Sequence, residues 1–126
     1  MKKIKITVEK TKTGFSAFSE DYPVCTTGSN MSEIRSNMIE AMNLYYEYTE
    51  TGKVISENDL NLKLDISSFF EYYKVINAKA FSNRVGMNQS LLAQYIKGKK
   101  KPSTTQTQRI LDGVQQLGRE LAEIRF

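Results

Sequence analysis

The sequence predicts an α+β fold, in which a small β-β-β-α-β domain is followed by an all-α domain that contains a helix-turn-helix. Two observations predict this class. Apolar and polar residues alternate in the early part of the chain, as in half-buried strands, and from position 67 apolar residues recur every three or four positions, as in helices. A chain of 126 residues has room for two small domains, which we place at 1–66 and 67–126.

Four strands are expected in the first domain. Ile4, Ile6 and Val8 share one face of the first strand, and the turn "TKTG" separates it from a second strand, "FSAFS", which begins at Phe15. The segment "PVCTTG" contains a brief third strand that ends at Gly28. A fourth strand is indicated by a second alternating run, formed by Leu60, Leu62, Leu64 and Ile66.

One helix is expected between the third and fourth strands. Asn30 followed three residues later by Glu33 is a capping-box pattern, and the helix should end near Tyr48. Its apolar side chains fall on one side, which we expect to face the core; they are Met31, Ile34, Met38, Ala41, Met42 and Tyr45.

The second domain should consist of helices only. The segment 67–76 predicts a first helix, Asn77 caps a second, and Gly86 interrupts the pattern before a third in "NQSLLAQYIK". Ser103 and Gln106 form a capping box for a last helix, which either covers the preceding helices or pairs with its copy in another subunit. The apolar seam of that helix comprises Ile110, Val114, Leu117, Leu121 and Ile124, and the interior glycines Gly113 and Gly118 require packing to hold it.

The charges of the chain are segregated. From Tyr72 to Leu111 there are eight basic residues and no Asp or Glu, which leaves ten basic and fourteen acidic residues, a net charge of −4, in the remainder. This is the electrostatic pattern of a nucleic-acid-binding module joined to a different kind of domain. The run "KGKKK" taken alone is equally compatible with a solvated face.

Composition excludes several other classes of function. We see no signal peptide and no apolar run long enough to span a membrane, and therefore expect a cytoplasmic protein without membrane contact. The chain has no histidine and one cysteine, so a zinc site, a histidine-based nucleophile relay and an internal disulfide all lack parts. We expect no cofactor and no enzymatic activity.

The segment "MNQSLLAQYIKGKKKPS" places amide side chains beside a cluster of positive charge. The second helix of a helix-turn-helix lies in the major groove, where amides match the donor and acceptor of adenine. Gln89, Ser90 and Gln94 lie away from the inward residues Leu92, Tyr95 and Ile96. We therefore expect Gln89, Ser90 and Gln94 to read bases, and a second set to hold the DNA backbone, namely Asn77, Lys79, Asn88, Lys97, Lys99, Lys100 and Lys101.

The helix-turn-helix interpretation rests on spacing. A small residue, Ser82, is followed four positions later by Gly86, which can adopt positive φ, and the apolar residues that fix the helix pair are Phe81, Val85, Met87, Leu92 and Tyr95. The stretch "AFSNRVGMNQSLLAQYIKGKKKPS" resembles the helix-turn-helix of the Cro and repressor family. An ordinary helical hairpin with a glycine turn is the alternative.

The first domain also carries a resemblance. The stretch "GFSAFSEDYPVCTTGSNMSEIRSNMIEAMNLYYE" resembles the N-terminal domain of HicB-type antitoxins through Val24, Cys25, Gly28, Asn30 and Glu33, and then Asn37, Glu40 and Ala41. The resemblance implies a partial RNase H-like fold. It also implies an antitoxin that covers a HicA-like ribonuclease toxin with its first domain and, as a homodimer or homotetramer, represses its own operon by binding double-stranded operator DNA.

Other interpretations stay open. In a stand-alone regulator, the first domain would only oligomerise or sense a ligand. In a metal-dependent nuclease, Glu9, Glu20 and Asp21 would be the carboxylates, although solvated loop acids explain them better. Cys25 is expected to be a buried structural residue. The toxin contact could lie on the outer helix face, with Glu33, Arg35, Asn37 and Glu40, or at a sheet edge.

Overall fold

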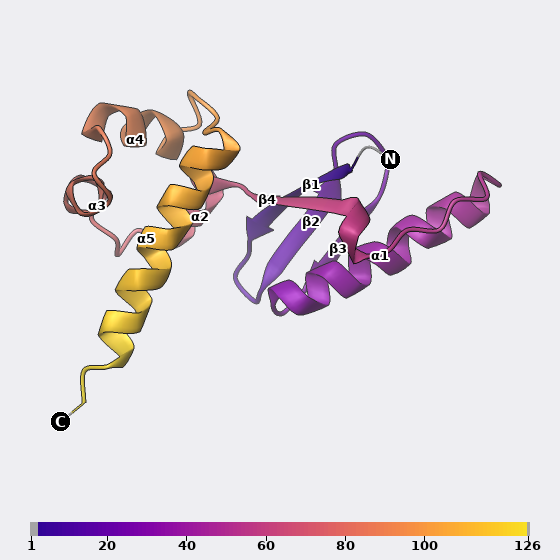
Figure 1. Ribbon diagram of the computed structural model, residues 1–126, viewed down its shortest axis with the longest axis horizontal. Coiled ribbons are helices and arrows are strands. Elements are labelled where there is room, and N and C mark those ends of the chain that lie inside the picture. Colours follow the sequence, from indigo (N-terminus) through magenta and orange to yellow (C-terminus); the bar gives the residue numbers. More distant parts are fainter. Residues whose placement is uncertain (1–2, 126) are drawn as a thin grey trace. The chain divides into compact units, whose positions relative to one another are not determined.

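The computed structural model describes residues 3–125 and divides the chain into two compact units, Met1–Asp65 and Ile66–Phe126 (Figure 1). The N-terminal unit combines a four-stranded sheet with one long helix, and the C-terminal unit contains only helices. The mixed α+β class is therefore confirmed. The domains predicted at 1–66 and 67–126 divide the chain one residue later than these units.

The sheet of the N-terminal unit has the strand order β3-β2-β1-β4. β1 pairs antiparallel with β2 and parallel with β4, where Val8 lies opposite Leu64. A parallel pair needs a long crossover, and β2, β3 and the helix supply it. The elements are β1 (Ile4–Lys10), β2 (Phe15–Ser19), β3 (Cys25–Gly28), α1 (Met31–Tyr48), the short 3₁₀ helix η1 (Glu57–Asp59) and β4 (Leu60–Leu64).

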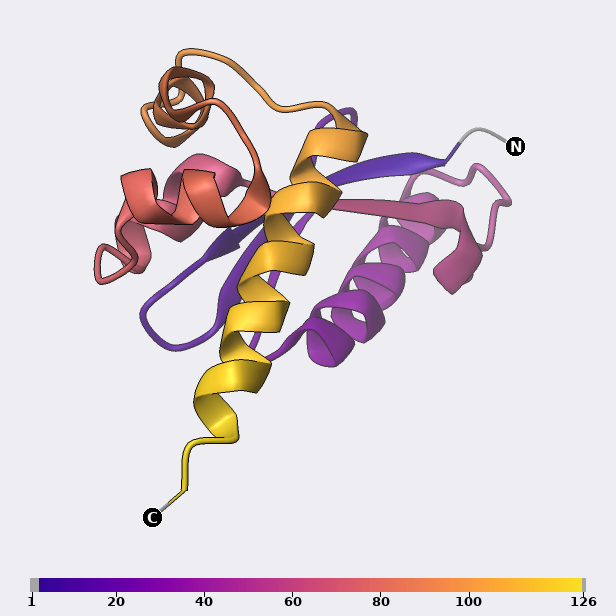
Figure 2. The same ribbon diagram turned by 60° about the vertical axis from the view of Figure 1, so that its left-hand side comes forward.

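α1 covers one face of this sheet, as both ribbon views show (Figures 1 and 2). The inward residues of β1, Ile4, Ile6 and Val8, are at most 5% exposed. They pack in one cluster with the buried stripe of the helix, which comprises Ile34, Met38, Met42 and Tyr46. The predicted apolar face of the helix is thereby confirmed, with Met31, Ala41 and Tyr45 partly buried at its borders.

The start of α1 follows the predicted cap with one difference. The Asn30 side chain accepts a hydrogen bond from the Glu33 backbone N–H at 2.9 Å, as a capping box requires. The Glu33 carboxylate, however, accepts from the backbone N–H of Ser29 at 2.8 Å, one residue before the cap. Both side chains therefore serve backbone groups at the entry to the helix.

Cys25 is exposed, so the expectation of a buried cysteine was wrong. It begins the edge strand β3, opposite Phe18, which in turn lies opposite Thr7 of β1. Side chains on one face of a sheet alternate with those on the other. The register therefore turns Cys25 toward the face with the exposed Phe18, while the preceding Val24 is buried.

The C-terminal unit is built from α2 (Ile66–Tyr72), α3 (Ala78–Val85), α4 (Gln89–Ile96) and α5 (Thr104–Ala122). α4 packs against α2 and α3, and α5 packs against α3. Ile66, which continues the alternation of the fourth strand in the sequence, instead begins α2 and is buried there. The buried apolar residues of the unit are Ile66, Phe69, Phe70, Phe81, Met87, Leu92, Tyr95 and Ile110.

α5 is held to α3 at a close approach that only glycine permits. A Cβ atom at Gly113 would lie 2.3 Å from Cγ1 of Val85, whereas a Cβ at Gly118 would meet nothing within 4 Å. The predicted apolar seam packs accordingly along its first half only. Ile110 is fully buried, but Leu121 and Ile124 are 57% and 60% exposed.

The two glycines of α5 predict opposite effects on stability. Gly113→Ala should lower the free energy of unfolding by about 1–3 kcal/mol, because the added methyl overlaps Val85. Gly118→Ala, the matched control, should raise it by about 0.5–1 kcal/mol, because alanine has a higher helix propensity than glycine and the added methyl meets no other atom. Urea unfolding of both variants measures this, and equal effects would contradict the packing described for Gly113.

A second prediction concerns alkaline pH. Burial, together with a hydrogen bond to Tyr22, raises the pKa of Tyr46 to about 12. An unfolded tyrosine ionises near pH 10, so above that pH the unfolded state loses a proton that the folded state keeps, and the free energy of unfolding falls. This contribution is intact below pH 10 and reaches a loss of about 1.4 kcal/mol by pH 11.

Tyr46→Phe should therefore lose less stability between pH 8 and pH 11 than the wild type. Tyr48→Phe is the control, because the Tyr48 side chain is 86% exposed and unfolding changes its surroundings little. Urea midpoints at the two pH values provide the measurement. A Tyr46→Phe variant with the wild-type pH dependence would show that another group is responsible.

Candidate nucleic-acid interface

The turn between α3 and α4 has the geometry that the sequence predicts. Gly86 ends α3 with φ 68° and ψ 33°, in the left-handed region that favours glycine. The backbone N–H of Met87 then donates to the Ser82 carbonyl at 2.9 Å. Ser82 is fully buried in α3, and its hydroxyl donates to the Lys79 carbonyl at 2.6 Å, so this small polar residue is satisfied within its own helix.

Both ends of α4 are fixed by hydrogen bonds. At the N-terminus, the Asn88 side chain accepts from the backbone N–H groups of Ser90 and Leu91 at 2.8 and 3.1 Å. At the C-terminus, the Ser67 hydroxyl of α2 donates to the Ile96 carbonyl at 2.8 Å. With Leu92 and Tyr95 buried beneath it, the helix is held in one orientation.

The outer face of α4 carries the predicted base-reading residues. Gln89 and Ser90 are exposed, and Gln94 is half-buried. Ser90, Gln94 and Lys97 are spaced as successive turns of one helix face. α4 lies at the periphery of the C-terminal unit in both ribbon views (Figures 1 and 2).

Ala93 belongs to the same face and was missed by the sequence analysis. It follows Ser90 by three residues and precedes Lys97 by four, and it is half-buried. A small apolar side chain at this position allows a close approach to α4 and suits the methyl group of thymine. The helical spacing alone could have identified it.

The expected backbone-contacting residues surround this face. Lys79, Lys97, Lys99, Lys100 and Lys101 are all exposed. The loop after α4 turns back at Gly98, with φ 74°, and the backbone N–H of Lys99 donates to the Gln94 carbonyl at 2.9 Å. The lysines therefore lie next to the C-terminal end of the helix that carries the amides.

Asn77 and Asn88 have an additional, structural role. Asn77 caps α3 through its side-chain oxygen, which accepts from the Ala80 N–H at 3.0 Å, as Asn88 caps α4. Capping uses the oxygen of each amide. The side-chain NH₂ groups could therefore donate to a phosphate. They lie at the N-termini of α3 and α4, the positive ends of the two helix dipoles.

Arg109 of α5 positions the turn. Its guanidinium donates to the Gly86 carbonyl at 2.6 Å and to the Val85 carbonyl at 3.1 Å. The sequence alone shows Arg109 only as one of the eight basic residues between Tyr72 and Leu111, because a contact across 23 residues leaves no local pattern. The last helix therefore fixes the geometry of the turn as well as covering α3.

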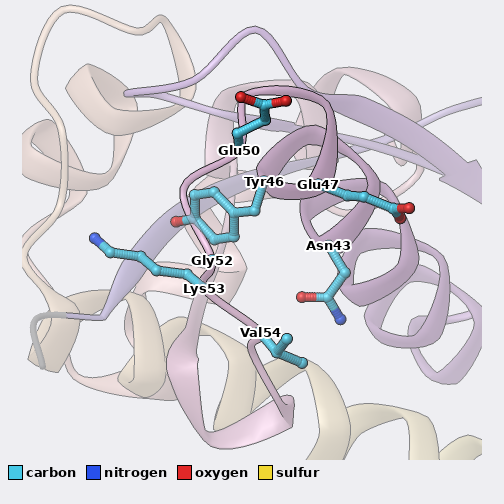
Figure 3. A pocket seen from close by; sticks show the side chains of 7 residues that line it. All are labelled: Asn43, Tyr46, Glu47, Glu50, Gly52, Lys53 and Val54. Atoms are coloured by element: carbon cyan, nitrogen blue, oxygen red, sulfur yellow. The ribbon is translucent and has the colours of Figure 1, made fainter.

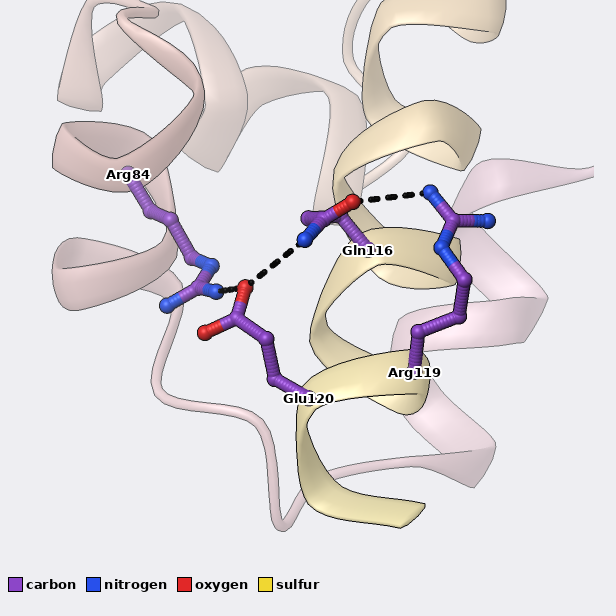
Figure 4. A network of polar contacts seen from close by, with 4 residues as sticks. All are labelled: Arg84, Gln116, Arg119 and Glu120. Atoms are coloured by element: carbon purple, nitrogen blue, oxygen red, sulfur yellow. Dashed lines mark hydrogen bonds and ion pairs between the residues drawn. The ribbon is translucent and has the colours of Figure 1, made fainter. Parts of the chain in front are cut away.

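A polar network joins α3 to the second half of α5 (Figure 4). Arg84 forms an ion pair with Glu120, whose carboxylate also accepts from Gln116 at 3.3 Å, and Arg119 donates to Gln116 at 2.8 Å. The hydrogen bond from Arg84 lowers the pKa of the Glu120 carboxyl. Arg84 is thus engaged within the unit, unlike the lysines that follow α4.

Possible metal ligands do not cluster in residues 3–125. No group of three Cys, Asp or Glu side chains in that range is placed to hold a metal ion. Of the acids considered in the sequence, Glu20 accepts a hydrogen bond from the Thr7 hydroxyl at 3.0 Å. Within the same range, none of the helices has the length and hydropathy needed to cross a membrane.

Comparisons with protein-family models, with curated proteins and with solved structures gave no match to this chain. The resemblances to HicB-type antitoxins and to the Cro and repressor family therefore rest on the residues quoted for them. The geometry of α3, the turn and α4 is independent of either resemblance.

Removing the Arg109 guanidinium should loosen the turn. Arg109→Ala is expected to lower the free energy of unfolding by about 1 kcal/mol and to speed hydrogen exchange of the Met87 amide, because two carbonyls of the turn lose their donor. Arg119→Ala removes the same charge from the same helix and serves as the control. Indistinguishable exchange of the Met87 amide in the two variants would contradict this role.

Proposed function

We propose that this chain is a HicB-type antitoxin and autorepressor, which reads its own operator DNA through α4 and covers a HicA-like ribonuclease with its N-terminal unit. One observation carries the DNA-binding part. Amide and hydroxyl side chains, exposed at Gln89 and Ser90 and half-buried at Gln94, line the outer face of a helix fixed at both ends. They lie beside exposed lysines, within forty residues that contain no acid.

The side chains of α4 and of the loop after it suit base recognition and phosphate binding, respectively. A glutamine amide donates and accepts at once, which matches N6 and N7 of adenine in the major groove. Ala93, next to Gln94, offers an apolar contact to the thymine methyl of the same or a neighbouring pair. The ammonium groups of Lys97 and Lys99 to Lys101 are point charges that suit phosphates and carry no sequence preference.

A dimer or tetramer fits this function. A single α4 of eight residues reads only a few base pairs. Two copies related by a two-fold axis would read half-sites about one helical turn apart, as in other helix-turn-helix repressors. The small core of each unit also favours association.

The antitoxin part rests on the resemblance of the first domain to HicB. A ribonuclease that binds RNA is expected to have a basic surface, and the N-terminal unit has a net charge of −2, from eight basic and ten acidic residues in positions 1–65. The opposite charges of the two units would let one chain engage a basic protein and a polyanion. No cofactor and no enzymatic step is part of this function.

Glutamine and lysine variants should differ in how they bind DNA from upstream of the gene: the former should lose sequence discrimination and the latter overall affinity. Gln89→Ala and Gln94→Ala should each reduce discrimination among operator variants by about 1–3 kcal/mol. Changing Lys99, Lys100 and Lys101 to alanine should weaken all sequences alike and reduce the salt slope by about 0.9 for each phosphate that the protein no longer neutralises. Gln115→Ala, on the exposed part of α5, is the control and should change neither the discrimination among operator variants nor the salt slope.

Equilibrium titrations at several salt concentrations measure both quantities. If the lysine and glutamine variants had the same effect across operator variants, the roles proposed for them would be wrong. A chain that binds DNA but has no neighbouring ribonuclease gene would favour the stand-alone regulator instead.

A further inference from the structure

The end of α1 and the loop after it border an open hollow of about 470 Å³ (Figure 3). The loop is held to the helix by two hydrogen bonds of one side chain, because Asn43 accepts from the Ile55 N–H at 2.8 Å and donates to the Ile55 carbonyl at 3.3 Å. The hollow is therefore preformed. It is lined by Asn43, Tyr46, Glu47, Glu50, Gly52, Lys53 and Val54.

Large apolar side chains in the second half of α1 and in the loop after it are exposed to an unusual degree. Leu44, Tyr48 and Val54 are 58%, 86% and 83% exposed. Leu44 and Tyr48 lie one turn apart on α1, so they share one face, and Val54 lines the hollow itself. Grouped exposed apolar side chains of this size are typical of a protein-binding surface.

The same surface is negatively charged. From Ser36 to Val54 there are three acids, Glu40, Glu47 and Glu50, and one base, Lys53, which leaves a net charge of −2. The last turn of α1 has no basic residue, so Glu47 lies at the negative end of the helix dipole, where a cation is usually found. A basic partner would balance the net negative charge of this segment.

Of the four helix residues that the sequence suggested as a toxin contact, all but Glu40 make internal contacts. Glu33 accepts from Ser29, Asn37 donates to the Thr27 carbonyl at 2.8 Å, and Arg35 lies 3.6 Å from Glu57. These side chains serve the fold of the unit. The second half of the helix is where apolar and acidic groups face outward together.

We propose that the surface formed by Leu44, Glu47, Tyr48, Glu50 and Val54, which we call the α1-end surface, is the docking site for a basic protein. This inference rests on the proposed function and identifies that protein as the ribonuclease toxin. The α1-end surface combines an apolar centre with an acidic border, which is complementary to a basic face that carries one apolar patch.

A basic side chain of the partner fits the hollow. Its aliphatic stem would pack against Val54, and its charged end would lie among the carboxylates of Glu47 and Glu50. Tyr48 and Leu44 would form the adjoining apolar contact.

The test uses the full chain, co-expressed with the HicA-type ribonuclease encoded next to its gene. Tyr48→Ala, and separately the double variant Glu47→Lys with Glu50→Lys, should each weaken binding by about 30-fold or more and restore RNA cleavage by the ribonuclease. The control is Glu9→Lys, which reverses a charge of the same unit on β1, on the sheet face opposite the buried Val8 and α1, and should change binding by less than about threefold.

The outcomes separate this inference from the proposed function. Thermal unfolding verifies that each variant is folded, and the Glu47 and Glu50 reversals should be at least as stable as the wild type, because they complement the helix dipole. Variants that bind the ribonuclease like the wild type would overturn the α1-end surface and leave the proposed function intact. A wild-type chain that does not bind the ribonuclease overturns both.

Discussion

The left-handed turn at Gly86 is the constraint on which the C-terminal unit depends. It ends α3, lets the Met87 N–H close onto Ser82, and starts α4 in a direction that buries Leu92 and Tyr95. Arg109 stabilises the two carbonyls of this turn from α5. Because α5 approaches α3 closely at Gly113, the turn, α3 and α5 form one rigid support, and the exposed face of α4 is a consequence of it.

Local patterns predicted the parts of this structure that local interactions determine. The caps at Asn30, Asn77 and Ser103, the alternation of β1 and the positive φ of Gly86 each depend on residues within four positions of one another. The outer face of α4 follows from helical spacing for the same reason. Most of the fold and the exposed residues of α4 could therefore be predicted from the sequence.

Long-range packing determined what the sequence could not predict. Cys25 is exposed because of the register of the edge strand, and Ile66 leaves the alternating pattern because the chain turns into α2. Arg109 acquires its role from a turn 23 residues away, and the α1-end surface depends on a loop that Asn43 fixes. For Arg109 and for the loop of the α1-end surface, the deciding partner lies 23 and 12 residues away, where periodicity carries no information.

Nuclear magnetic resonance of the full chain with operator DNA tests most directly whether the outer face of α4 contacts bases, which is the central claim. We predict that the side-chain NH₂ signals of Gln89 and Gln94 shift most and show contacts to major-groove protons. The backbone amide signals of α1 should not shift. Unchanged Gln89 and Gln94 signals in a chain that is saturated with its operator would contradict this claim.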